Sequence, residues 1–309
     1  NIDEPALRAF VARVFPGTVD NVERVRSGAS TPVYRVRSAT GVFYVRLAET
    51  PEASLAPEAR VHALLRERGV RLPEVVFLES FDEALGRSVL VTTEIPGEPV
   101  AVREVDATTH RIVRDAGRDL AIINQLSIQG YGWIDRRHGG DALQAEYTER
   151  RAWAAGYVDA VELLVRTRRL AGRAARRAQA AVESWATLST GERSCIAHGD
   201  FDVTHIFQLA GRYSGVIDFG EIRGTDRLYD LGHFHLHDGE TLAGFVLPDL
   251  LVGYHEVQPS PEDLLARIDL EAVAIGLAAL ARTVGRTESA HAIWLNWRVH
   301  QLLDRLSLQ

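Results

Sequence analysis

The sequence predicts an α+β fold in two lobes: a small N-terminal lobe with an antiparallel sheet and one helix, and a larger, mainly helical C-terminal lobe. Short alternating apolar runs between turn residues fill the first third of the chain, whereas apolar residues recur at helical spacing from about Val102 onward. One strand-rich segment, Cys195 to Asp218, interrupts the helical part. We expect the lobes at residues 1–95 and 96–309, with a ligand cleft near Glu94 to Glu98.

The N-terminal lobe is expected to begin with a helix at Glu4 to Phe15. Strands are expected where alternating apolar residues lie between turns such as those at Gly28 and Gly41. These strands are Val22–Arg26, Val33–Arg37 and Val42–Leu47, and two more strands are expected at Val75–Leu78 and Ser88–Thr93. Pro57 to Arg68 has the apolar spacing of a helix, and a Pro/Gly-rich segment at residues 96–99 ends the lobe.

The composition excludes several classes of protein. With 309 residues, 46% hydrophobic and 25% charged, the chain is an ordinary globular protein, and its single cysteine, Cys195, rules out an intrachain disulfide. A net charge of -7 argues against nucleic acid as a partner. The most apolar run, Ala272 to Ala281, is too short to span a membrane, and Asn1 to Arg8 has no signal-like pattern. We therefore expect a cytoplasmic monomer or homodimer.

The strand-rich segment contains the residues with the clearest chemistry. It reads His-Gly-Asp at residues 198–200, then two apolar strands around a turn at Gly211, then Asp-Phe-Gly at residues 218–220. Such a hairpin can bring Asp200 and Asp218 to one site. Phosphoryl transfer needs this pair, because one carboxylate takes the proton of the attacking hydroxyl while the other holds the magnesium ion.

The spacing can be compared with the catalytic loop of kinases, which reads His, any residue, Asp, four residues, Asn, and is followed by Asp-Phe-Gly. His198, Asp200 and the Asp-Phe-Gly triplet fit this template. The position of the metal-binding Asn is occupied by His205. A protein kinase is disfavoured, because Gly199 replaces the arginine of His-Arg-Asp and no Ala-Pro-Glu follows.

With these motifs the chain resembles the aminoglycoside phosphotransferase family, kinase-like small-molecule phosphotransferases that include choline, homoserine, macrolide and hygromycin kinases. The resemblance covers roughly residues 20–240 and includes Ser54–Leu78, Val91–Pro99 and Gly130–Trp133. It implies a two-lobed, protein-kinase-like fold. It also implies ATP or GTP as phosphoryl donor, Mg²⁺ or Mn²⁺, and a small-molecule hydroxyl acceptor such as an aminoglycoside-like antibiotic or a metabolite.

The resemblance assigns roles by position. Asp200 would be the catalytic base, Asp218 the main magnesium ligand, and Asp230 the acceptor of the loop's backbone N–H groups. The implied nucleotide-binding positions are Ser27, Gly28, Ser30 and Thr31 over the phosphates, and Thr93, Glu94 and Ile95 along the adenine. The chain has no lysine, so Arg46 is the candidate for contacting the phosphates and pairing with Glu58.

The histidines have open alternatives. His198 is expected to brace the loop by hydrogen bonding, and His205 is either a metal ligand or a packing residue, its imidazole suiting manganese or zinc better than magnesium. The expected acceptor pocket is Asp202, His233, His235 and His237, and Trp294, Trp297 and His300 either line it or pack nearby. His233 and His237 stand four residues apart and could also form a zinc pair.

Three functions are compatible with these residues. The first is transfer of a γ-phosphoryl group to a small-molecule hydroxyl. The second is a kinase-like protein that binds nucleotide or ligand with weak or no catalysis, because His205 replaces the metal-binding Asn. The third is a metal-dependent hydrolase built from His198, Asp200, His205 and the run from His233 to His237.

Overall fold

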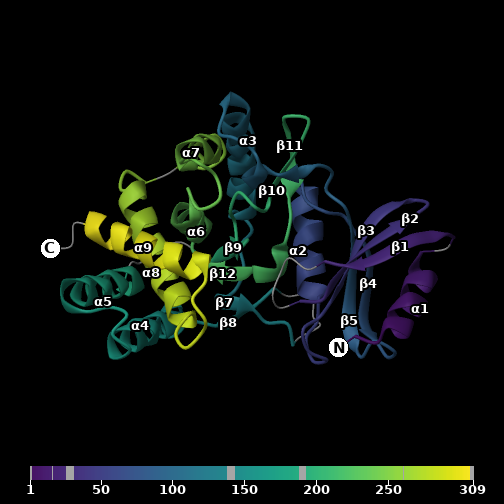
Figure 1. Ribbon diagram of the computed structural model, residues 1–309, viewed down its shortest axis with the longest axis horizontal. Coiled ribbons are helices and arrows are strands. Elements are labelled where there is room, and N and C mark those ends of the chain that lie inside the picture. The colour runs from purple at the N-terminus through teal and green to yellow at the C-terminus, as the bar shows by residue number, and fades with distance from the viewer. Residues whose placement is uncertain are drawn as a thin grey trace. The chain divides into compact units, whose positions relative to one another are not determined.

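The computed structural model describes residues 2–15, 17–25, 31–137, 143–187, 193–259 and 261–306. They divide into two compact units (Figure 1). Unit 1 comprises Asn1–Pro96, Ile134–Leu143 and Ser214–Ile217, and unit 2 comprises Gly97–Trp133, Gln144–Tyr213 and Asp218–Gln309. The predicted α+β fold is confirmed, with an antiparallel sheet in the N-terminal unit and mainly helices in the other. Two short later segments belong to unit 1, which a division at residue 95 leaves out.

Unit 1 is built on a five-stranded sheet in the order β1-β2-β3-β5-β4, with every neighbouring pair antiparallel. The strands are β1 (Val19–Arg24), β2 (Val33–Ser38), β3 (Gly41–Leu47), β4 (Val75–Asp82) and β5 (Arg87–Thr93). Each coincides with a predicted strand, with shifts of a few residues at the ends. In β3, Val45 pairs with Val91 and Arg46 with Leu90, so alternate residues face opposite sides of the sheet.

Two helices in unit 1 flank this sheet. Helix α1 (Glu4–Val14) begins where the side chain of Asp3 accepts the N–H of Ala6, an N-cap, and it buries Leu7, Phe10 and Val11 against Val36, Val45 and Leu47 of the sheet. Helix α2 (Ala56–Glu67) begins next to a smaller buried cluster that contains Leu55 and Leu90. The alternation along β3 therefore turns Val45 and Leu47 toward α1.

Unit 2 is mainly helical. Its helices are α3 (Ala107–Ile123), α4 (Arg150–Arg166), α5 (Gly172–Thr187), α6 (Tyr229–His237), α7 (Leu247–His255), α8 (Leu264–Arg282) and α9 (Ala290–Arg305). Helix α8 lies against α4, α5, α6 and α9 (Figure 1) and buries its run from Ala272 to Leu277. The apolar stretch seen in the sequence is thus a core helix. Within the described part of the chain, no helix is long and apolar enough to cross a membrane.

Two small sheets consist mainly of segments of unit 2. One has the order β11-β10-β6, with β6 (Glu98–Pro99), β10 (Ile206–Leu209) and β11 (Arg212–Val216), and contains the hairpin predicted around Gly211. The other has the order β8-β7-β12-β9, with β7 (Tyr131–Ile134), β8 (Ala145–Tyr147), β9 (Cys195–Ala197) and β12 (Arg223–Thr225). The expectation of a single strand-rich segment after Val102 was wrong. Strands of three or four residues are too short to show alternation.

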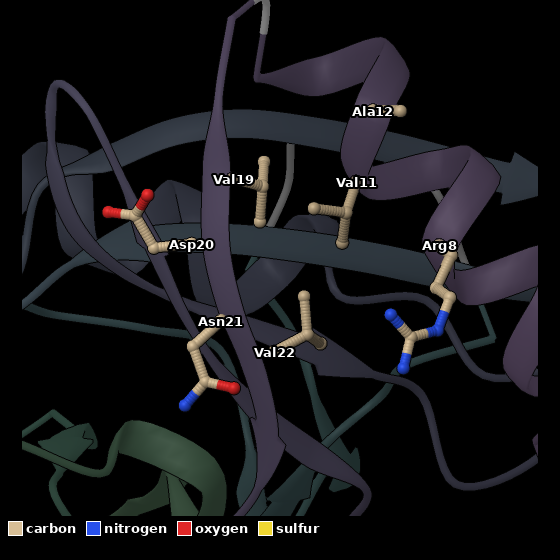
Figure 2. A pocket seen from close by; sticks show the side chains of 7 residues that line it. All are labelled: Arg8, Val11, Ala12, Val19, Asp20, Asn21 and Val22. Carbon is tan, nitrogen blue, oxygen red and sulfur yellow. The ribbon is translucent and has the colours of Figure 1, made fainter.

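A hollow of about 230 Å³ lies within unit 1 between α1 and β1 (Figure 2). Figure 2 shows Val11, Val19 and Val22 gathered between the helix and the strand, with Arg8 on the helix. None of the residues predicted to bind nucleotide, metal or acceptor, or to act in catalysis, lines this hollow. It is a gap in side-chain packing beside α1.

The contact between α3 and α7 gives a stability prediction. At Gly253 in α7, an added Cβ would lie 1.8 Å from the carbonyl oxygen of Arg114 in α3. Gly253→Ala should therefore lower the free energy of unfolding by about 2 kcal/mol or more, because the helices must separate. Gly156→Ala, at a helical glycine with nothing within 4 Å, is the matched control and should raise it by up to about 1 kcal/mol. Urea unfolding followed by circular dichroism measures the free energy of unfolding of both variants. Equal stabilisation of the two variants would contradict the close contact between Gly253 and α3.

Candidate active site

The catalytic-loop segment, residues 198–205, connects β9 to β10 and is held by one buried carboxylate. Asp230 Oδ2 accepts the backbone N–H of His198 at 2.9 Å, and its Oδ1 accepts that of Gly199 at 2.9 Å. Asn124 Nδ2 donates a third hydrogen bond to Oδ2 at 2.9 Å. Asp230 stands in the first turn of α6, where the helix dipole favours negative charge. The structure thus contains the contacts expected of the loop anchor.

Gly199 explains why this loop differs from the His-Arg-Asp of protein kinases. Its φ is +89°, a left-handed conformation that favours glycine, and a Cβ there would lie 1.9 Å from the carbonyl oxygen of Glu221. The backbone of the loop therefore packs directly against the segment that follows Asp218. A larger residue would push the two segments apart.

His198 braces the loop from the inside. Its ring is fully buried, and Nδ1 accepts the backbone N–H of Asp200 at 3.3 Å. The ring contacts Phe219 edge to face, with centroids 4.7 Å apart, and also Phe201. These contacts fit the structural role expected for His198, and they orient the residue that follows Gly199.

His205 lies between the two acids of the motif. Its Nδ1 is 2.7 Å from the carbonyl oxygen of Asp200 and 3.9 Å from the Oδ2 of the same residue, while its Nε2 is 3.9 Å from Asp218 Oδ2. Both carboxylates therefore face one imidazole. Burial disfavours the charged ring, but the carboxylates of Asp202, Asp200 and Asp218 outweigh burial and raise the pKa of His205.

Asp218 begins the Asp-Phe-Gly triplet in an unusual conformation. Its φ of 63° and ψ of 66° are left-handed, and its Oδ1 accepts the N–H of Gly220 at 3.3 Å. A non-glycine residue in this region costs about 1 kcal/mol or more, which is typical of functional positions. The side chain is half exposed, so its carboxylate faces solvent at the mouth of the hairpin.

The donor atoms here suit a cation. One carboxylate oxygen each from Asp200 and Asp202 and one ring nitrogen of His205 lie within 4.8 Å of one another. Carboxylate oxygens are the ligands magnesium prefers, whereas imidazole is a softer donor that suits manganese or zinc. Asp202 also caps the loop itself, because its Oδ1 accepts the N–H and the hydroxyl of Thr204 at 2.6 and 2.5 Å.

In unit 1 the ion pair expected between β3 and α2 is present. Arg46 Nη1 lies 3.2 Å from Glu58 Oε1, and Arg46 Nη2 donates to the Thr31 hydroxyl at 3.4 Å. Glu58 is buried, and its Oε2 lies 3.6 Å from Arg136 Nη2. One carboxylate therefore orients two guanidinium groups. Ser27, Gly28 and Ser30, the other positions expected over the phosphates, lie outside the described residues.

The segment expected to lie along the adenine continues β5. The N–H of Thr93 donates to the carbonyl oxygen of Glu74, and that of Glu94 donates to the carbonyl oxygen of Val42. Both N–H groups are therefore hydrogen-bonded within unit 1. The Glu94 carboxylate accepts hydrogen bonds from Arg35 at 2.8 and 3.0 Å. Ile95 packs next to Gly215.

The histidines of α6 separate into two groups. His233 Nε2 lies 3.3 Å from Asp200 Oδ1, and the ring of His237 lies 4.6 Å from that of His233. Burial lowers the pKa of His233 well below its usual range, and the neighbouring His237 lowers it further. His235 points elsewhere, because its Nε2 contacts Asp269 of α8 at 2.9 Å. The structure brings His233 to Asp200 and His237 to His233, whereas His235 does not contact either of them.

Asn124, at the end of α3, is a residue that the sequence analysis missed. Its side-chain amide donates both to Asp230 and to the carbonyl oxygen of Ile196 in β9. Asn124 is distant in sequence from the motif and has no motif of its own, so no pattern indicated it. Of the aromatic residues considered for the acceptor pocket, Trp294 stacks on His237, with centroids 6.0 Å apart, whereas Trp297 is exposed.

The chain combines a five-stranded antiparallel sheet unit with a catalytic loop whose Asp200 lies near the Asp-Phe-Gly triplet at residues 218–220. This combination is typical of kinase-like phosphotransferases. Comparison with known families agrees: the model of the phosphotransferase enzyme family matches residues 21–267. The chain belongs to this family and is a phosphotransferase. No curated protein sequence matches it.

Solved structures share its fold. A thermostable mutant of aminoglycoside phosphotransferase APH(4)-Ia, in complex with ADP and hygromycin B, is 16% identical with a TM-score of 0.71, covering 97% of this chain and 98% of that one. Macrolide 2'-phosphotransferase MphH from Brachybacterium faecium is 18% identical with a TM-score of 0.62, covering 96% and 97%. The predicted kinase-like fold is thus confirmed.

The Asp230 anchor can be tested by a substitution that keeps its size. Asp230→Asn should lower the free energy of unfolding by about 2 to 4 kcal/mol, because an amide has one acceptor oxygen where the buried carboxylate accepts three N–H groups. Protection of the His198 and Gly199 amides from hydrogen exchange should fall with it. Asp249→Asn is the control: this carboxylate lies 2.6 Å from His110 at the surface, and its loss should cost under about 1 kcal/mol. Unchanged protection of both amides would contradict the anchor.

Proposed function

We propose that this phosphotransferase moves the γ-phosphoryl group of ATP or GTP to a hydroxyl group of a small molecule, with Asp200 as catalytic base and Asp218 as metal ligand. The observation that carries the proposal is the geometry around His205: the carboxylates of Asp200 and Asp218 both approach its ring, to 3.9 Å. A proton acceptor and a cation ligand would then lie in one site. The solved structure of APH(4)-Ia with ADP and hygromycin B supports a nucleotide donor and a hydroxyl-bearing acceptor.

The proposed step uses Asp200 to orient the acceptor. The acceptor hydroxyl donates a hydrogen bond to the Asp200 carboxylate, and its oxygen attacks the γ-phosphorus. As the new P–O bond forms, the bond to the bridging oxygen of the nucleotide breaks, and the hydroxyl proton passes to Asp200. The Asp230 anchor and the His198 brace keep Asp200 in place for this step, so little reorganisation is needed.

Asp218 and His205 would hold the divalent cation, together with the oxygens of the nucleotide. When bound, the cation neutralises the charge on the phosphates and polarises the transferring group. The donors fit such an ion, since a carboxylate and an imidazole nitrogen face each other across 3.9 Å. The imidazole shifts the expected preference from Mg²⁺ toward Mn²⁺.

Arg46 would contact the nucleotide phosphates in place of a lysine. Glu58 orients its guanidinium through the 3.2 Å ion pair, which leaves a fixed positive charge beside Thr31. An arginine presents a planar fork to phosphate oxygens where a lysine presents a point charge. Thr93 to Ile95 would present to the adenine backbone groups other than the N–H groups of Thr93 and Glu94, which are already hydrogen-bonded.

The acceptor would lie against α6. His233 stands 3.3 Å from Asp200, and His237 and Trp294 form a stacked aromatic surface next to it. Flat rings of this kind suit the faces of sugar or other cyclic acceptors. Asp202 would contribute charge at the edge of this surface, although its carboxylate also holds Thr204.

His205 also favours a second candidate, a kinase-like protein that binds nucleotide with weak turnover. Its raised pKa favours an imidazolium among the carboxylates, and this charge competes with the cation that transfer needs. The hydrolase alternative has less support, because His198 is buried and its Nδ1 is taken up by the loop backbone.

Removing the base distinguishes these functions. Asp200→Asn should lower kcat by about 100-fold or more, the usual contribution of general base catalysis, while the Kd for ATP changes little. A coupled assay of ADP release with a panel of hydroxyl acceptors measures kcat, and calorimetry measures nucleotide binding. Asp249→Asn, at a surface carboxylate that pairs with His110, is the control and should keep the turnover. Wild-type protein that binds ATP without turnover would favour the second candidate, and normal turnover in Asp200→Asn would overturn the first.

His205→Asn tests the metal assignment. The amide oxygen is a harder donor than imidazole, so the ratio of kcat/KM with Mg²⁺ to that with Mn²⁺ should rise by about tenfold. The same ADP-release assay with each metal gives the ratio. His110→Asn, at a histidine that pairs with Asp249 at the surface, should leave it unchanged. An unchanged ratio in His205→Asn would place His205 outside the metal site.

A further inference from the structure

A second group of donors lies at the other end of α6. His237 is the last residue of this helix, Glu240 follows three residues later, and His291 is in the first turn of α9. Glu240 Oε2 lies 2.7 Å from His237 Nδ1, and its Oε1 lies 2.6 Å from His291 Nδ1. One donor atom from each residue falls within 4.8 Å of the others. The three side chains therefore converge on one point.

The two rings are held in place by stacking. His237 and His291 are nearly parallel, with an interplanar angle of 10° and centroids 5.8 Å apart. Trp294 stacks on His237 at an interplanar angle of 15°. Ring orientation is thus fixed before any ligand arrives, which lowers the entropy cost of binding.

The Glu240 carboxylate at this point is ionised, and its hydrogen bond raises the pKa of His291 in turn. Burial opposes ionisation, but hydrogen bonds from His237 and His291 outweigh it and lower the pKa of Glu240 to about 2. The carboxylate is therefore ionised throughout the physiological range. The side chain of His291 is 52% exposed, which gives an ion and water access to the cluster.

We propose that His237, Glu240 and His291 form a binding site for a divalent cation of the zinc class. Two imidazole nitrogens and one carboxylate oxygen are a donor set that Zn²⁺ uses, with water in the fourth position. Ligand atoms around a tetrahedral zinc ion lie about 3.3 Å apart. The observed separations of 2.6 and 2.7 Å need to open by only about 0.7 Å on this estimate, and the ion replaces the two Nδ1 protons that Glu240 accepts.

The possible metal-ligand atoms of this cluster differ from those of the proposed catalytic site. Among the described residues, the other convergent group is Asp200, Asp202 and His205, which offers two carboxylates and one imidazole. Harder cations prefer the oxygen-rich group and zinc the nitrogen-rich one. A zinc ion at His237 would tie the end of α6 to the start of α9.

A zinc titration of the full chain tests the proposal without an activity measurement. Protein stripped with EDTA is titrated with Zn²⁺ against a chromophoric chelator, in excess Mg²⁺. We expect one equivalent to bind with a Kd below about 1 µM, corresponding to about -8 kcal/mol. Glu240→Gln and His291→Asn should each raise this Kd by about 100-fold, since loss of even an outer-shell partner costs 10- to 100-fold.

Controls identify the ligands. His110→Asn removes an imidazole that lies 2.6 Å from a carboxylate outside the cluster and should bind zinc like the wild type. Co²⁺ bound to the wild type should show the visible absorption of tetrahedral coordination, and His291→Asn, at a ring that is 52% exposed, should lose it. The absence of a tight zinc equivalent, or its loss in His205→Asn instead of Glu240→Gln, would overturn the proposal.

Discussion

The catalytic loop depends on one buried carboxylate. Asp230 accepts hydrogen bonds from the backbone of His198 and Gly199 and from Asn124, and these bonds offset the cost of burying its charge. The same bonds fix the backbone one and two residues before Asp200. Because Gly199 also packs on Glu221, the loop and the segment after Asp218 are held in register. The proposed base and metal ligand meet at His205 for this reason.

Much of this could be predicted from the sequence, because the contacts follow local patterns. The strands of unit 1 are short apolar runs between turn residues, and all five were expected close to their observed positions. The spacing from His198 to Asp218 matches the kinase template, and the family resemblance implied the role of Asp230. The family resemblance and the absence of lysine likewise implied the pairing of Arg46 with Glu58. The short strands β7, β8 and β12 had no such pattern.

Other features depend on packing between helices, which the sequence does not encode locally. Asn124 reaches Asp230 only because α3 ends beside α6, and His291 reaches Glu240 because α9 begins near the end of α6. The two pairs are separated by 106 and 51 residues in the sequence, and neither belongs to a shared motif. His235 differs, since helical periodicity already places it on another face from His233. The prediction that His235 lines the acceptor pocket did not take the helical period of 3.6 residues into account.

Helix α6 links the features of unit 2 through that same period. Asp230, His233 and His237 occupy positions i, i+3 and i+7, which share one face of a helix. The first anchors the loop, the second lies 3.3 Å from Asp200, and the third belongs to the proposed zinc cluster. His235, on another face, packs toward α8. A helix of nine residues is too short to bend much, so a clamp at His237 would restrain His233 beside the base.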